Sequence, residues 1–218
     1  MQSLAEALKA VEDHRSNQGK RHELGALLLL MCTGMLCGCR GPAALASWAA
    51  RQESVLLKAM GFARGKAPSY GTLQRTARDL NVDSFEQVLQ HWAEEVLQGQ
   101  GPAEPLQGVA LDGKVLRGSH EGALPGVHLL AALAHQVGLT LAQVDVPAST
   151  NEHKASLPLL AGLTLTNRVI TADAAFMQRD VCQLIVHRQG HYLIVLKDNQ
   201  PELRQTVQDW FEPFPPTR

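Results

Sequence analysis

Apolar positions along the chain change their spacing near residue 100. Before that point they recur at helical intervals, as in the run of Phe85, Val88, Leu89 and Trp92. After it, short apolar runs alternate with turn residues, which is typical of strands and their connections. The joint at 99–105, GQGPAEP, is rich in Gly and Pro and suits a linker. We therefore expect a helical domain over residues 1–100 and a second domain over 106–218.

The first half contains one strongly apolar segment, LGALLLLMCTGMLCG at 24–38. It is shorter than the roughly 20 residues that a bilayer requires, and charged residues crowd both of its ends. We therefore expect a buried core helix here and no membrane span. Further helices are expected at 41–60, 69–80 and 84–97, with Ser69 as the N-cap of the second.

The segment from Pro68 to Leu80 resembles the second helix of a helix-turn-helix unit. In that arrangement Gln74, Arg75 and Arg78 would face outward toward a DNA groove. A plain packing helix is the alternative, because short helix pairs are common.

The second half predicts strands at 108–116, 127–135, 139–147, 168–176 and 191–198. Helical patterns separate the last three of them. The order is therefore β-β-β-α-β-α-β, in which three antiparallel strands precede two crossovers. We interpret this as the mixed α/β sheet of an incomplete ribonuclease-H-like domain. The very apolar strand at 191–198 is expected at the centre of the sheet.

Charge adds little for the whole chain and more for one segment. The net charge of −1 and the pI near 6.7 give no overall basic signal for nucleic acid. Between Arg40 and Arg78, however, seven basic residues face only Glu53, a net +6 that can neutralise phosphates or simply form a solvated helical face. No secretory signal precedes the four cysteines, so we expect reduced thiols in a cytoplasmic protein.

Two aspartates lie at or near the ends of apolar runs. Asp112 follows Val-Ala-Leu, and Asp173 follows Val-Ile-Thr-Ala. A carboxylate within a central strand is costly to desolvate unless it is paired or binds a metal. Neighbouring strands would bring the two carboxylates close enough to share Mg²⁺, a hard cation that prefers oxygen ligands. Strand-end aspartates are frequent, so this pair alone is weak evidence for a metal site.

Four motifs follow one another in the second half: ALDGKVLRGS at 110–119, STNEHKASLPLL at 149–160, TADAAFMQ at 171–178 and LIVLKDNQPEL at 193–203. Together they resemble the H-repeat-associated DDE transposases of bacterial insertion sequences. The first half is similar to the region that precedes the catalytic domain in that family, through DHRSNQGKRHEL, ASWAARQ and PSYGTLQR. Four ordered motifs are far more specific than any one of them.

The resemblance implies roles for individual residues. Asp112 and Asp173 would be the first and second catalytic acids and would bind Mg²⁺ or Mn²⁺ for cleavage and strand transfer at double-stranded transposon ends. The residues implied in DNA binding are Lys114, Arg117, Lys197, Asn199, Arg75 and Arg78. Supporting roles are implied for Asn151, Glu152 and Gln178, with helix capping as the alternative for the first two.

The sequence departs from the family after the strand at 191–198. The third acid of DDE transposases is a glutamate on a helix well beyond that strand, and nothing in LRQTVQDWFEPFPPTR at 203–218 matches its motif. We therefore expect a truncated, inactive transposase with exposed apolar surface, which would associate with itself or with a full-length transposase. The alternatives are a non-catalytic DNA-binding or regulatory fragment and a ribonuclease-H-like nuclease that needs fewer acids.

Overall fold

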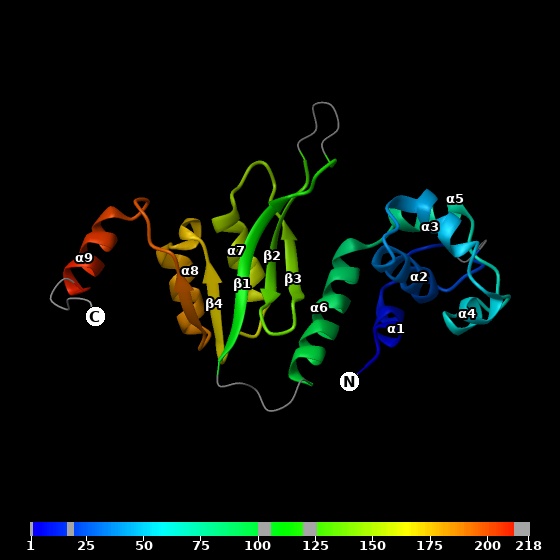
Figure 1. Cartoon of the computed structure of the whole chain (residues 1–218), viewed down its shortest axis with the longest axis horizontal. Helices are drawn as coiled ribbons and strands as arrows, with labels where there is room; N and C mark the ends of the chain where they lie inside the picture. Colours follow the sequence, from blue (N-terminus) through cyan, green and yellow to red (C-terminus); the bar gives the residue numbers. More distant parts are fainter. Residues whose placement is uncertain (1, 17–19, 100–105, 120–125, 212–218) are drawn as a thin grey trace, which may run out of the picture. The chain divides into compact units, whose positions relative to one another are not determined.

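The computed structural model describes residues 2–16, 20–99, 106–119 and 126–211, so all of the expected linker except Gly99 lies outside the described residues. The chain divides into two compact units, Met1–Gly99 and Gln100–Arg218. Figure 1 shows the first unit as helices only and the second as a sheet with helices.

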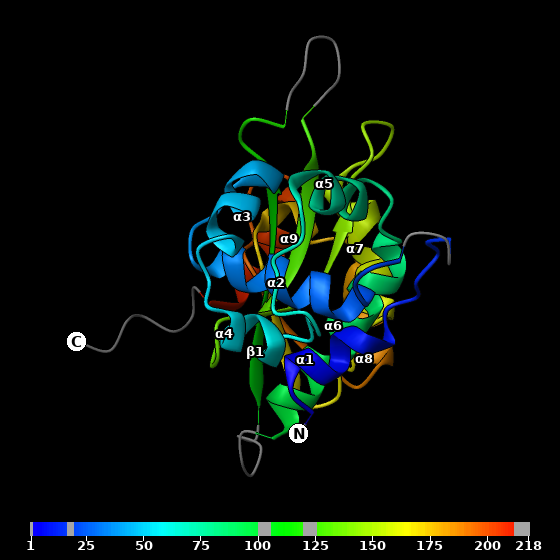
Figure 2. The same cartoon turned by 90° about the vertical axis from the view of Figure 1, so that its right-hand side faces the viewer.

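The first unit is built around α2 (Leu24–Leu36), in which eight of 13 residues are buried. Its other elements are α1 (Leu4–Ala7), the 3-10 turn η1 (Leu8–Ala10), α3 (Gly41–Ala49), α4 (Ser54–Ala59), α5 (Tyr70–Arg78) and α6 (Val82–Gln98). Figure 2 shows α2 among α1, α3, α4 and α5. One face of α2 packs on Leu45 and Leu73, while another meets Leu8 and the predicted apolar stripe of α6. The all-round apolar pattern of α2 thus reflects burial on several sides.

Within the described ranges, no single helix is long and apolar enough to cross a bilayer. The helices α2 and α3 pass that test only as a pair, and the pair is bent by 99°.

Two expectations for the helical half are wrong in detail. The single helix expected at 41–60 is two helices, because Glu53 adopts an extended backbone before α4 and the Gln52 side-chain amide donates to the Trp48 carbonyl at the end of α3. The helix-turn-helix resemblance also fails, since the long connection 60–69 separates α4 from α5 instead of a short turn. The N-cap is confirmed: the Ser69 hydroxyl accepts a hydrogen bond from the Thr72 N–H.

The second unit is a five-stranded mixed sheet with the order β3-β2-β1-β4-β5. Its elements are β1 (Gln107–Val115), β2 (His128–Ala134), β3 (Leu139–Asp145), α7 (Glu152–Ala161), β4 (Arg168–Ala172), the 3-10 turn η2 (Ala174–Phe176), α8 (Arg179–His187), β5 (His191–Ile194) and α9 (Pro201–Phe211). β2 is antiparallel to β1 and β3, whereas β4 is parallel to β1 and β5. This order and these directions are those of the expected ribonuclease-H-like sheet.

The two faces of the sheet differ in burial. Figure 1 shows α7 and α8 on the same side of the sheet, where they cover buried positions such as Val109, Leu111 and Ile170. Because side chains alternate along a strand, the residues between these positions point to the opposite face. There Leu133, Leu193 and the residues near them are exposed or half-buried. We call this second surface the open face.

The apolar strand expected at 191–198 is neither central nor that long. β5 ends at Ile194 and lies at the edge of the sheet, and Leu193 on its open face is 70% exposed. In the second motif, α7 continues through Pro158. The edge position of β5 follows from the pairing order, which an apolar run alone does not encode.

Candidate functional site

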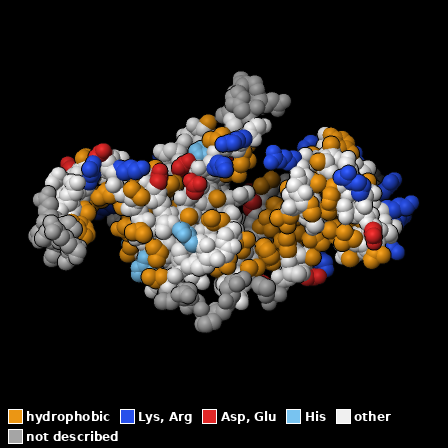
Figure 3. All heavy atoms as spheres, viewed as in Figure 1, with side chains coloured by type: hydrophobic (Ala, Val, Ile, Leu, Met, Phe, Trp, Pro, Cys, Tyr) orange, Lys and Arg blue, Asp and Glu red, His pale blue; other side chains and the backbone are white. Residues whose placement is uncertain are grey.

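The two predicted acids lie next to each other across β1 and β4. These strands are parallel and pair Ala110 with Thr171, so two further residues along each strand bring Asp112 opposite Asp173. Both side chains alternate away from the buried positions and are exposed on the open face. They line one shallow hollow of about 510 Å³ together with Leu193 and Val195. Figure 3 shows Asp and Glu side chains gathered near this end of the unit.

Asp173 also shapes the backbone that follows it. The strand expected to reach residue 176 ends at Ala172, because the Asp173 Oδ1 accepts a 2.9 Å hydrogen bond from the Ala175 N–H and caps η2. A carboxylate has about four lone-pair sites, so this bond leaves acceptor capacity for a ligand. The cap holds the carboxylate at a defined place beside the hollow.

The donor chemistry fits a hard divalent cation, but the number of donors is small. Two carboxylates from adjacent strands supply oxygen ligands of the kind that Mg²⁺ and Mn²⁺ prefer. Among the residues that the structure describes, no group of three or more His, Cys, Asp or Glu side chains is placed to hold a metal. The described part of the site therefore offers an incomplete ligand set.

Glu152 lies on the covered side of β1, away from Asp112. Its carboxylate is packed where a side chain on Gly113 would be, and it is hydrogen-bonded to His128 Nε2 at 2.7 Å. Successive residues of a strand face opposite sides of the sheet, so Gly113 faces the covered side and Asp112 the open face. Glu152 therefore packs against β1 on the side opposite Asp112. Asn151 is the N-cap of α7, since its Oδ1 accepts a hydrogen bond from the Lys154 N–H.

A second hollow, of about 790 Å³, is lined in part by His128, Glu152, His153 and Gln178. Its two histidines are engaged, His128 with Glu152 and His153 with Asp180. The hydrogen bond from His153 lowers the pKa of the Asp180 carboxyl. The two histidines of this hollow therefore have structural partners, and we assign the hollow no catalytic role.

The last two motifs are tied together by amide side chains. Asn199 Nδ2 donates to the Ala174 carbonyl at 2.6 Å, and Gln200 Nε2 donates to the Met177 carbonyl at 3.1 Å and to Gln178 Oε1 at 3.4 Å. The chain after β5 is thereby fastened to the turn after Asp173. The side-chain amide of Asn199, which was expected to contact phosphate, is thus hydrogen-bonded to the backbone. Gln200 was missed, although it stands inside the LKDNQP motif.

The predicted cations do not form one group. Lys114 is exposed two residues beyond Asp112 on the same face, whereas Arg117 lies in the turn after β1 and Lys197 in the connection after β5. Arg75 and Arg78 belong to α5 of the first unit. The guanidinium of Arg78 is held by Asp79 through bonds of 2.6 and 2.9 Å, while Arg75 lines a hollow.

The fold and the paired aspartates define a ribonuclease-H-like protein. Two family models match the chain, a "Transposase DDE domain" over residues 104–217 and a "DDE_Tnp_1-associated" domain over residues 5–93. The chain belongs to the DDE transposase family.

Individual relatives agree with this assignment. "Putative transposase YncI" of Escherichia coli K12 is 28% identical over 97% of this chain and 84% of its own length. A protein of Xanthobacter autotrophicus, "Uncharacterized protein in dhlA 3'region", is 30% identical over 92% and 67%. "H repeat-associated putative transposase YhhI" of Escherichia coli K12 is 24% identical over 97% of this chain, which spans 55% of that relative.

Solved structures are more distant. A piggyBac transposase in a synaptic complex with hairpin DNA is 12% identical with a TM-score of 0.44, over 94% of this chain and 48% of that one. A simian T-cell lymphotropic virus intasome is 11% identical with a TM-score of 0.36, over 81% and 60%.

Proposed function

We propose that Asp112 and Asp173 are the first two catalytic acids of a DDE transposase that cleaves and joins double-stranded DNA. The observation that supports this most is the register of β1 and β4, which brings both carboxylates to one hollow on the open face. Family membership supplies the reaction class. The four free cysteines fit the reducing cytoplasm, where we propose that the protein acts.

Asp112 and Asp173 would hold Mg²⁺ or Mn²⁺, which when bound supplies Lewis-acid activation of a water or 3′-hydroxyl nucleophile. The chain's own residues then have separate tasks. Asp173 is fixed by its cap on η2, and Asp112 is fixed by the strand that Glu152 supports. Lys114 offers a positive charge on the face where a phosphodiester would lie.

We further propose that a polypeptide of residues 1–218 does not join DNA strands by itself. Among the described residues no third carboxylate joins the two aspartates, and two carboxylates alone hold a divalent cation weakly and leave the second ion of a two-metal site poorly placed. Joined transposon-end products from the purified chain with Mg²⁺ or Mn²⁺ would contradict this. A complex with a longer transposase would supply a third ligand, whereas a homo-oligomer repeats the same two acids.

The metal site itself is tested by Mn²⁺ titration followed by electron paramagnetic resonance. Asp112→Asn and Asp173→Asn should each weaken binding by about tenfold or more, a change of at least ~1.4 kcal/mol. Asp83→Asn is the matched control, because that exposed carboxylate belongs to α6 of the first unit and should leave the affinity unchanged. Equal effects of all three changes would argue against the proposed ligands.

A further inference from the structure

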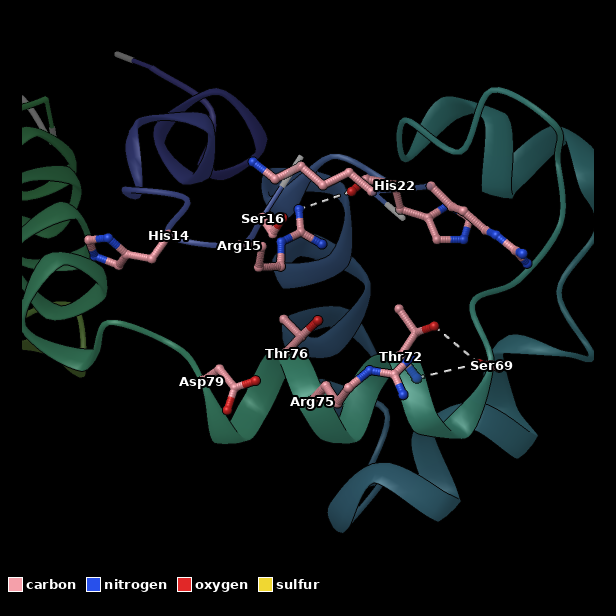
Figure 4. Close-up of a pocket in the computed structure, with 11 residues that line it drawn as sticks. His14, Arg15, Ser16, His22, Ser69, Thr72, Arg75, Thr76 and Asp79 are labelled. Carbon is pink, nitrogen blue, oxygen red and sulfur yellow. Dashed lines mark hydrogen bonds between the residues drawn. The ribbon is translucent and has the colours of Figure 1, made fainter. Parts of the chain in front are cut away.

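The first unit contains a concave, cationic surface that the proposed catalytic site does not use. Residues 14–16 and 20–22 form one wall and helix α5 forms the other, and together they line a hollow of about 760 Å³. Figure 4 shows Arg15 and His22 on one wall, with Ser69, Thr72 and Arg75 on the other. We call this surface the α5 cleft.

The charges that line the α5 cleft are strongly unequal. Four cations line it, Arg15, Lys20, Arg21 and Arg75, against one carboxylate, that of Asp79. Arg78, outside the cleft, neutralises Asp79 through a two-point ion pair. The cleft therefore keeps a positive charge that its own acids do not cancel.

Two of these cations are free to meet a ligand. Arg15 is held by Asp13 at 2.8 Å, and Lys20 lies 3.3 Å from the same carboxylate. In the part of the chain that the structure describes, Arg21 and Arg75 form no ion pair. They come from opposite walls, so an anion in the cleft would meet a guanidinium from each side.

The electrostatic environment of His22 agrees with this picture. Burial lowers the pKa of the imidazole, and the charges of Arg15, Arg21 and Arg64 lower that pKa further. A protonated histidine is thus disfavoured beside the cations. The hydroxyl groups of Ser69, the N-cap of α5, and of Thr72, in its first turn, also line the cleft. The N-terminus of a helix favours anions.

We propose that the α5 cleft binds the phosphate backbone of double-stranded DNA, with Arg21 and Arg75 as its principal contacts. The choice of duplex DNA as the ligand rests on the proposed transposase function. Backbone contacts of this kind position a protein on a duplex without reading its sequence. The sequence predicted that Arg75 and Arg78 bind DNA. The lining of the cleft retains Arg75, leaves out Arg78 and adds Arg21.

The test is fluorescence anisotropy with a short duplex of arbitrary sequence, measured over a range of salt concentrations in EDTA. Each lost phosphate contact lowers the slope of log affinity against log salt by about 0.9. Arg21→Ala and Arg75→Ala should each lower this slope, and by a similar amount for duplexes of unrelated sequence. Arg75→Lys should restore most of the slope because it keeps the charge.

The matched control is Arg51→Ala, an exposed arginine of the same unit outside the cleft, which should leave the slope unchanged. Equal losses for Arg51→Ala and Arg75→Ala would overturn the cleft in favour of general charge. Tighter binding of single strands or RNA than of duplex would overturn the assigned ligand.

Thermal unfolding monitored by circular dichroism checks that each variant folds. The same titration with Asp112→Asn/Asp173→Asn separates the two proposals, because binding through the cleft does not involve those carboxylates. If the parent chain does not bind Mn²⁺, the proposed catalytic site is wrong. If duplex binding nevertheless survives the double change, the proposed DNA-binding role of the α5 cleft still holds.

Discussion

Gly113 is a residue of the second unit whose lack of a side chain leaves room for a neighbour. A Cβ there would collide with the Glu152 carboxylate, which is also paired with His128. The glycine of the DGK motif and the glutamate of the NEHK motif are thus two halves of one contact. Glu152 therefore contacts the first motif without facing the hollow that Asp112 lines.

We expect Gly113→Ala to displace Glu152 and break its pair with His128. In a Glu152→Ala background the added methyl group meets no carboxylate, so the cost should disappear. The coupling free energy between the two changes, measured by urea unfolding of all four proteins, should be about 1 kcal/mol. Strictly additive free energies of unfolding would show that the two residues do not interact.

His22 gives the first unit a pH-dependent stability. Its imidazole is packed edge-on against the Phe62 ring at 5.1 Å, and burial together with Arg15, Arg21 and Arg64 lowers its pKa from the ordinary 6.5. Below that value the unfolded chain binds a proton that the folded chain resists. Stability should therefore fall as the pH drops from about 7 through the ordinary pKa toward the lower folded one.

The comparison of His22→Gln with the parent chain isolates this contribution. Thermal unfolding measured between about pH 5 and 7 should show a shallower loss of stability in the variant, since glutamine does not titrate. A parallel pH dependence in both proteins would show that His22 is not its source.

At the scale of elements, the edge of the sheet and the last helix carry unpartnered apolar surface. β5 exposes Leu193, and the connection after it exposes Val195. Helix α9 has no buried residue, and its apolar side chains recur on one stripe: Leu203, Val207, Trp210 and Phe211. Contiguous apolar surface of this kind drives association between protein molecules.

We expect the chain to self-associate, and Leu193→Lys to reduce this by placing a charge on the open face. Val186→Lys on α8 is the matched control, because Val186 is also more than half exposed but belongs to the helical layer. Static light scattering over a series of concentrations measures the difference. The same reduction in both variants would point to net charge instead of the open face.

Pattern and propensity predicted most elements, and the failures have identifiable causes. The runs that form β1, β2 and β3 are short, apolar and bounded by turn residues, so their predicted limits were close to the observed ones. Extended backbone at Glu53 broke the helix expected at 41–60, and the side-chain cap of Asp173 ended β4 early. These events depend on single residues and their hydrogen bonds, which average spacing does not record.

At the scale of the whole molecule, the candidate chemistry is divided between two compact units. The motif resemblance predicted Asp112 and Asp173 on neighbouring strands, and the register of β1 and β4 brings the two residues side by side. The resemblance was not enough to separate Arg75 from Arg78 or to place Glu152 behind the strand. Those distinctions depend on an ion pair with a neighbour and on the face toward which a side chain points.

The central claim is that a divalent cation binds between Asp112 and Asp173. Paramagnetic broadening of backbone amide signals by substoichiometric Mn²⁺ locates the ion directly. We expect the amides of 110–113 and 171–175 to broaden first, because these segments carry the two carboxylates and line the hollow between them. Broadening centred on His128 and Glu152, or on His153 and Asp180, would contradict the account.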